Sequence, residues 1–277
     1  YYAQRQLTWI VLGLLAAFFM YRIDYHLIAK FSLPAVIISV ILLILVLIVD
    51  KDQSVKRWIN LGDFNLQPSE ITKLTFLTYL SYWLAGHREK RDWSKNAFWH
   101  HVKYELLPFI LLLTFICSLI LIEPDMDTTI MLGMTAFIVY FLSGNDSIHL
   151  AGSLATGAVS ALAVTIATFA AKYRLTRLTT FFDFWRTGEI SEPFGAGYQF
   201  RQILVAVASG GWFGLGFGNS RQKYHYLGDT AFSDTIFAIF AEEFGLFGCV
   251  VLISIFVYIF LKGFKIAVNA PDKLGFL

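Results

Sequence analysis

Long apolar runs, separated by short polar stretches, form the main pattern of this chain. A membrane-spanning helix needs about 20 mostly apolar residues, and seven runs approach or exceed that length. They cover residues 6–22, 33–50, 69–86, 105–122, 126–143, 147–171 and 234–262. The pattern predicts an all-α polytopic membrane protein in which almost the whole chain is helix or short connection.

The composition agrees with this prediction and excludes an ordinary soluble domain. Hydrophobic residues make up 57% of the chain and charged residues 15%, whereas about a quarter of the residues of a soluble domain are charged. Cys117 and Cys249 fall within predicted spans, where a free thiol serves as a small apolar side chain, so no disulfide is expected. The first apolar run has no small-residue cleavage site after it and is expected to be a true span rather than a signal peptide.

Four polar stretches separate the predicted spans, at residues 21–31, 50–70, 86–105 and 172–233. The fourth holds nine of the 20 glycines, more than any other stretch, and is the expected place for a functional site. Basic residues are almost evenly divided between the two sides of the membrane, but the dense cluster HREKRDWSK is typical of a cytoplasmic loop. This orientation places residue 1 and the long stretch 172–233 outside. An anionic ligand would account for the basic charge of that stretch.

The segment NLQPSEITKL, residues 65–74, carries charged side chains into the start of a predicted span. Pro68 suits the first position of a helix, and Glu70 and Lys73 are then three residues apart on one face, close enough to pair. One interpretation is a neutral ion pair near the membrane interface. The other is that the pair faces a polar cavity and marks a substrate path, whose mouth Arg57 could also reach.

The segment LIEPDMDTTI, residues 121–130, is a tight break between two apolar runs, which Pro124 explains because proline cannot continue a helix. Glu123, Asp125 and Asp127 could hold a divalent cation there, but acidic turns are common without one. The sequence therefore leaves a metal site unknown.

The segment ASGGWFGLGFGNSRQK, residues 208–223, is rich in glycine. No βαβ pattern surrounds it, so a dinucleotide-binding loop is excluded. Gly214 and Gly218 match the small-residue spacing of packed membrane helices. Alternatively, the glycines let backbone N–H groups approach a phosphate, and Arg221 and Lys223 add positive charge.

The segment FSDTIFAIFAEEFG, residues 232–245, places three carboxylates at the start of the last predicted span. Ser233 is a good N-cap, so Asp234 is expected in the first helical turn, where the helix dipole favours a negative charge. That position fits either a capping role or a reactive carboxylate. Glu242 and Glu243 lie deeper and must find hydrogen-bonding or cationic partners, because isolated burial of a charge is costly.

Taken together, these segments strongly resemble the SEDS family, the FtsW/RodA/SpoVE peptidoglycan glycosyltransferases. The runs GYQFRQILVAVASGGWFGLGFGNSRQKYHYL and SDTIFAIFAEEFGLFG, both within residues 197–248, carry most of the resemblance. Segments 57–74, 123–129 and 173–185 agree with it in order and spacing. The piece GFGNSRQKYHYL is closer to the FtsW branch, which acts in cell division.

The resemblance implies a helix bundle of ten transmembrane helices with both ends in the cytoplasm. On that map residues 1–277 form a single membrane domain, a fragment that corresponds to the second through eighth helices and lacks the first and the last two. Residues 172–233 become a large extracytoplasmic loop. The protein is then expected in the bacterial cytoplasmic membrane, with its active site facing outside.

The activity implied by the resemblance is polymerisation of lipid II into glycan strands. The acceptor hydroxyl attacks the anomeric carbon of the donor with inversion, and undecaprenyl pyrophosphate leaves. Asp234 matches the essential aspartate of the family and would be the general base. The substrate-binding residues implied in the same way are Arg57, Glu70, Lys73, Arg221 and Lys223. Arg57 and Lys73 would hold pyrophosphate or orient the base, and Glu70 would orient Lys73.

The resemblance also implies partners and a cofactor. A class B penicillin-binding protein would crosslink the new strands, other divisome proteins and membrane lipid would surround the enzyme, and no nucleic acid is expected. A divalent cation, Mg²⁺ or Mn²⁺, is implied by the family alone. Two positions depart from the family pattern: Gly228 stands where proline is usual, and Asp127 stands where glycine is usual.

Two other functions compete with the polymerase. A lipid II flippase or another transporter of lipid-linked substrates would also use charges within the membrane, and a scaffold would only recruit a partner. A transporter needs accessible charges through both halves of the bilayer, whereas the charges at membrane depth in this chain gather on the side predicted to face outside, with Glu242 and Glu243 the exceptions. The enzyme is therefore the preferred prediction.

Overall fold

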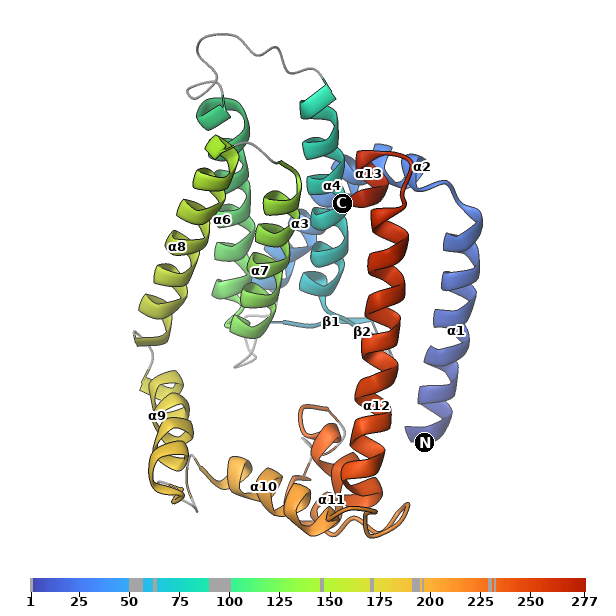
Figure 1. The fold of residues 1–277 in the computed structure, drawn as a ribbon, viewed down its shortest axis with the longest axis vertical. Helices are drawn as coiled ribbons and strands as arrows, with labels where there is room; N and C mark the ends of the chain where they lie inside the picture. Colours follow the sequence, from blue (N-terminus) through green and yellow to red (C-terminus); the bar gives the residue numbers. More distant parts are fainter. Residues whose placement is uncertain are drawn as a thin grey trace. The chain divides into compact units, whose positions relative to one another are not determined.

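The computed structural model describes residues 2–49, 57–61, 64–89, 101–144, 147–169, 172–190, 195, 197–228, 231 and 233–277. Contacts within the chain divide it into two compact units. The first comprises Tyr1–Leu162 together with Asn269–Leu277, and the second comprises Ala163–Val268. Each unit is described by itself (Figure 1).

Helices dominate the first unit, as the apolar runs predict. They are α1 (Tyr2–Arg22), α2 (Tyr25–Lys30), α3 (Ser32–Val49), α4 (Pro68–Glu89), the π-helical turn η1 (Val102–Leu106), α6 (Leu107–Ile122), α7 (Met126–Leu142), the first part of α8 (Ser147–Phe169) and α13 (Lys273–Phe276). The departure from an all-α fold is a hairpin of β1 (Ile59–Leu61) and β2 (Phe64–Leu66), in which Ile59 pairs with Leu66.

The core of this unit lies among α3, α4, α6 and α7, which lie side by side (Figure 1). Leu43 of α3, Phe76 of α4, Ile116 of α6 and Tyr140 of α7 are fully buried. Other faces of the same helices are apolar and exposed; Leu74, for example, is 73% exposed. In lipid such a face needs no covering, since backbone polar groups are satisfied within each helix. The prediction of an all-α polytopic membrane protein is confirmed, the hairpin aside.

Length and composition alone single out two spanning helices among the described residues, Val102–Ile122 and Ile236–Val268. Three shorter apolar helices follow other predicted runs: Gln6–Arg22, Ser32–Ile48 and Met126–Leu142. Apart from one or two residues at their ends and an interruption at Gly245, the seven predicted runs are thus helical wherever the structure describes them.

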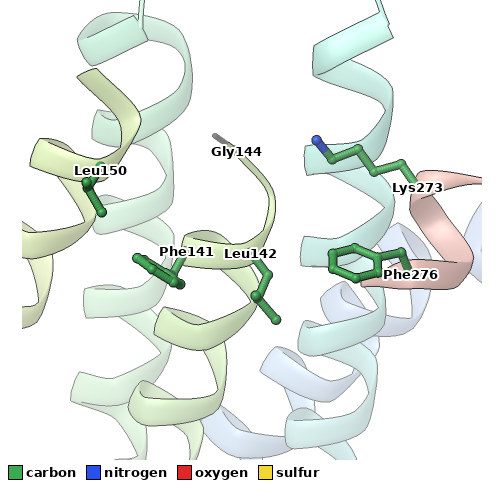
Figure 2. Close-up of a pocket in the computed structure, with 6 residues that line it drawn as sticks. All are labelled: Phe141, Leu142, Gly144, Leu150, Lys273 and Phe276. Carbon is green, nitrogen blue, oxygen red and sulfur yellow. The ribbon is translucent and has the colours of Figure 1, made fainter. Parts of the chain in front are cut away.

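The C-terminal residues pack against earlier helices of the first unit, to which they belong. The Tyr25 hydroxyl donates a hydrogen bond to Asp272 (2.6 Å), and Asp272 caps α13 by accepting from the Gly275 N–H. Lys273 and Phe276 of α13 face α7 and α8 across a cavity of about 520 Å³ (Figure 2). The cavity is otherwise lined by Phe141, Leu142, Gly144 and Leu150.

The second unit shows that residues 172–233, a single polar loop in the sequence prediction, hold regular structure. They contain α9 (Lys172–Thr187), α10 (Tyr198–Gly210) and α11 (Gln222–His225), and α12 (Ile236–Val268) follows them. Helix α10 packs against α12 (Figure 1). Gly245 interrupts α12 with a φ of 65° and a ψ of −168°, a conformation that glycine adopts without steric cost.

Candidate functional site

The interruption of α12 is filled by the glycine-rich loop that follows α10. In a continuous helix the Leu246 N–H would donate to the Glu242 carbonyl. Here the Leu246 N–H donates to the Gly211 carbonyl (2.9 Å), and the Glu242 carbonyl accepts from the Leu215 N–H instead (2.9 Å). The broken helix and the loop therefore exchange backbone hydrogen bonds, and both of these groups remain satisfied.

Glycine is required where these two segments touch. A Cβ at Gly214, whose φ is 78°, would lie 2.1 Å from the carbonyl oxygen of Glu243, and a Cβ at Gly245 would lie 2.4 Å from the backbone nitrogen of Gly214. The helix-packing interpretation of Gly214 and Gly218 is wrong, because the loop after Gly210 is not helical. The glycines let the loop approach the backbone of α12 closely. Their alternative role, in which backbone N–H groups bind a phosphate, stays a prediction.

Glu242 is buried and anchors this loop with its side chain. Its carboxylate accepts hydrogen bonds from the Ser220 hydroxyl (2.6 Å) and from the backbone N–H groups of Arg221 (3.2 Å) and Gln222 (3.3 Å). The Ser209 hydroxyl donates a further bond (3.3 Å). The prediction that Glu242 must find partners is confirmed, and the partners lie in the end of α10, the adjacent loop and the start of α11.

Glu243 holds the same loop through an ion pair. Its carboxylate accepts from the Lys223 ammonium (2.8 Å) and from the Ser220 N–H (3.4 Å). The hydrogen bond to Glu243 raises the pKa of Lys223. The charge of Lys223 is therefore partly neutralised by Glu243, whereas the side chain of Arg221 is exposed. The predicted substrate-binding role of both residues stays a prediction.

Asp234 is exposed just before α12. The expected N-cap at Ser233 is wrong by two residues, because α12 begins at Ile236 and Thr235 accepts the first intrahelical bond, from the Ala238 N–H (3.0 Å). The carboxylate of Asp234 thus lies in the preceding turn. Upstream, Gly228 has a φ of 53°, which proline cannot adopt because its ring fixes φ near −65°. The backbone of this chain at position 228 therefore suits glycine, although proline is usual there in the family pattern.

The first unit joins two other predicted segments at the turn between α6 and α7. The Arg57 Nε–H donates to the carbonyl of Glu123 (3.0 Å), and its guanidinium also donates to the carbonyl of Pro124. The Gln67 side-chain amide donates to the carboxylate of Asp125 (2.9 Å). Segments 57–74 and 123–129 therefore meet in space, which their separation in sequence does not reveal.

Asp125 and Asp127 have different surroundings in this turn. Asp125 is the N-cap of α7, and its carboxylate accepts from the N–H (3.1 Å) and the hydroxyl (3.0 Å) of Thr128. Asp127 is exposed in the first turn of α7. Within the described residues, these acids do not form a set of converging metal ligands with Glu123.

Glu123 is a buried carboxylate whose unusual surroundings the sequence pattern does not reveal. It is fully buried, and neither of its carboxylate oxygens has a hydrogen-bond partner among the described residues. Burial and the neighbouring charge of Asp125 raise the pKa of Glu123 to about 8, against the opposing effect of Arg57. The only sequence signal was an acidic residue next to proline at a helix end, which does not distinguish a buried group from an exposed one.

Glu70 and Lys73 form the predicted pair on α4. The Lys73 ammonium donates to the Glu70 carboxylate at 2.8 Å, and the Lys73 side chain is 16% exposed against 54% for Glu70. This contact is the one required if Glu70 orients Lys73. Their roles toward a substrate, and the shared cavity predicted with Asp234, stay predictions.

The fold and these two groups of polar residues define a polytopic helical membrane protein with charged side chains gathered at helix ends. The chain belongs to the FtsW/RodA/SpoVE family, described as cell cycle proteins, whose model matches residues 1–277. The family resemblance predicted from the sequence is confirmed.

Curated relatives of this family match nearly the whole chain. It is 33% identical over 278 residues to the probable peptidoglycan glycosyltransferase FtsW of Trichlorobacter lovleyi, covering 99% of this chain and 68% of that protein. It is 36% identical over 283 residues to the FtsW of Aliivibrio salmonicida, covering 100% and 66%. Stage V sporulation protein E of Bacillus subtilis is 31% identical over 279 residues, with 99% and 71% covered. The chain thus spans about two thirds of the length of these relatives.

Solved structures show the same fold. A chain of a peptidoglycan synthase complex, solved to describe the coordination of polymerization and crosslinking, matches with a TM-score of 0.69 and 25% identity, covering 98% of this chain and 71% of that one. The rod shape determining protein RodA of Thermus thermophilus matches with a TM-score of 0.59 and 22% identity, over 98% and 68% of the two chains.

Proposed function

We propose that this chain carries the catalytic part of a peptidoglycan glycosyltransferase that polymerises lipid II at the outer face of the bacterial cytoplasmic membrane. The relatives named above support the reaction class. The observation that carries the assignment to this chain is the position of Asp234. It is an exposed carboxylate in the turn just before α12, the helix that the glycine-rich loop contacts through Glu242 and Glu243.

In the proposed step, Asp234 accepts the proton of the acceptor's sugar hydroxyl. The oxygen forms a bond to the anomeric carbon of the lipid-linked donor, the bond from that carbon to the pyrophosphate oxygen breaks with inversion, and undecaprenyl pyrophosphate leaves with the electron pair. A base must lie within hydrogen-bond reach of the proton that it removes, and the exposure of Asp234 permits this approach. Arg57, Lys73 and Arg221 would balance the charge of the pyrophosphate.

A divalent cation, Mg²⁺ or Mn²⁺, belongs to this proposal through the family alone. The acidic turn 123–127 is a poor fit, because Asp125 accepts bonds from Gln67 and Thr128. Mg²⁺ is commonly bound by one or two carboxylates together with substrate phosphates. No step of the reaction is assigned to the ion.

The proposed partners follow from the same assignment. A class B penicillin-binding protein would crosslink the strands, in keeping with the synthase complex that this chain resembles in fold. The similarity to relatives named FtsW favours a role in cell division beside other divisome proteins.

Polymerisation of labelled lipid II by the full-length protein with its partner tests the proposal. We expect Asp234→Asn to lower the rate by about 10²–10⁴-fold, the usual contribution of a general base, while binding of lipid II persists. Asp127→Asn, which neutralises another exposed carboxylate at a helix start, is the matched control and should retain activity. Undiminished polymerisation by Asp234→Asn would contradict the assignment of the base. Transport of lipid II across vesicles without polymerisation would favour a flippase instead.

A further inference from the structure

Three side chains that can ligate a metal meet inside the first unit, away from the residues of the proposed reaction. His101 immediately precedes η1, Glu105 lies within η1, and His149 lies in the first turn of α8. They are 1%, 3% and 1% exposed. One ligand atom from each lies within 4.8 Å of the other two.

The hydrogen bonds around the cluster orient the two imidazoles. His149 Nε2 lies 2.6 Å from the carbonyl oxygen of Tyr140. A carbonyl can only accept, so Nε2 carries the proton, and in the neutral ring Nδ1 keeps its lone pair. His101 Nε2 lies 3.2 Å from the hydroxyl of the same tyrosine, and its Nδ1 faces Glu105 Oε2 at 2.9 Å.

This arrangement is typical of the surroundings of a bound metal. Metal-ligating histidines almost always bond through their second nitrogen to a carbonyl, a carboxylate or water, which fixes the ring and its tautomer. Tyr140 provides that bond to His149 through its backbone and contacts His101 through its side chain. Glu105 also lies in a π-helical turn, and such turns occur frequently at functional sites.

A bound dication fits the cluster better than an ion pair of His101 and Glu105 alone. A buried carboxylate is costly unless a positive charge compensates it, and either a proton on His101 or a dication would compensate Glu105. One dication bound to two imidazoles and one carboxylate also accounts for the convergence of all three ligand atoms.

We propose that His101, Glu105 and His149 form a binding site for a divalent transition metal of the Zn²⁺ class. Imidazole nitrogen and carboxylate oxygen are ordinary Zn²⁺ ligands, and three protein ligands leave a fourth position for water. The bound ion would tie η1 to α8. The site is at the opposite end of α6 from Glu123, and the 16 residues of that helix correspond to roughly 24 Å.

Metal content of the purified chain in detergent tests the proposal. The protein is stripped with a chelator, loaded with Zn²⁺ and separated from unbound ion. We expect one Zn²⁺ per chain and a rise in thermal stability on loading. His149→Asn and Glu105→Gln should each weaken Zn²⁺ binding by at least about 10-fold, the lower bound of what even outer-shell partners contribute. Loading with Co²⁺ should give the absorption bands of a four-coordinate ion.

Two control variants show whether these three side chains hold the ion. Tyr140→Phe keeps the carbonyl bonded to His149 and should retain one Zn²⁺, although it loses the hydroxyl near His101. His26→Ala removes an exposed histidine that bonds to Asp24 and Asp272, and it should leave Zn²⁺ uptake unchanged. The proposal is wrong if the wild-type chain takes up no Zn²⁺, or if His149→Asn takes it up equally well. Loss of stability in His149→Asn without metal uptake by the wild-type chain would show that His149 is a structural residue and not a metal ligand.

Discussion

Replacing Glu123 by glutamine should change how the stability of the protein depends on pH. The side chain is fully buried at the turn between α6 and α7, and its surroundings raise its pKa from the ordinary 4.5 to about 8. Between those values the folded protein keeps a proton that the unfolded chain has lost. Because the unfolded chain binds fewer protons in this window, the stability that Glu123 contributes is fully present below pH 4.5 and falls as pH rises toward 8.

The size of the effect follows from the pKa shift. Each unit of pKa difference is equivalent to 1.36 kcal/mol, so the wild-type chain should lose about 2 kcal/mol between pH 6 and pH 8, where the curve flattens near the folded-state pKa. Glutamine has nearly the same volume as glutamic acid but does not titrate in this range. The stability of Glu123→Gln should therefore rise relative to wild type by the same amount over these two pH units.

Thermal unfolding in detergent micelles, followed by tryptophan fluorescence from pH 6 to pH 8, measures the difference. Asp127→Asn is the matched control: it neutralises an exposed carboxylate of the same turn and should leave the slope of the wild-type profile unchanged. Parallel pH profiles for wild type and Glu123→Gln would refute the reasoning, because they would show that Glu123 titrates alike in the folded and unfolded chains.

Three further predictions concern the interrupted helix and the pair on α4. Gly245→Ala should destabilise the protein by more than about 2 kcal/mol in thermal unfolding, because alanine is strained at this positive φ and its Cβ clashes with backbone atoms. Gly263→Ala is the control and should not destabilise the protein in this way, because its new Cβ meets no described atom within 4 Å. Glu242→Gln should cost about 1.5–3 kcal/mol, the worth of a hydrogen bond to a charged group, and a variant as stable as wild type would contradict its anchoring role. Lys73→Met should alter stability by less than about 1 kcal/mol, because the ion pair of Lys73 with Glu70 is partly exposed. The same variant should lower the rate of lipid II polymerisation. A loss of polymerisation that only follows a loss of folding stability would indicate a structural role for Lys73.

The apolar runs were sufficient to predict the class of the protein. A run of about 20 apolar residues has one stable arrangement in a bilayer, a helix that satisfies its own backbone, so the spans could be placed without any tertiary information. The family was predictable as well, because its motifs keep their order along the chain. Glu70 and Lys73 could be paired in advance, since the contact depends only on helical spacing.

Contacts between distant segments could not be predicted in this way. The sequence shows Glu242 and Glu243 as carboxylates that need partners, but only the fold shows that Gly245 breaks α12 and lets the preceding loop supply them. Glu123 and Asp125 look alike in the sequence, and both are buried. Glu123 has a raised pKa and no hydrogen-bond partner among the described residues, whereas Asp125 caps a helix. Local patterns predicted the apolar helices but missed α9, α10 and α11 within residues 172–233. Burial and hydrogen-bond partners depend on what packs against each residue, and that was decided by the tertiary structure.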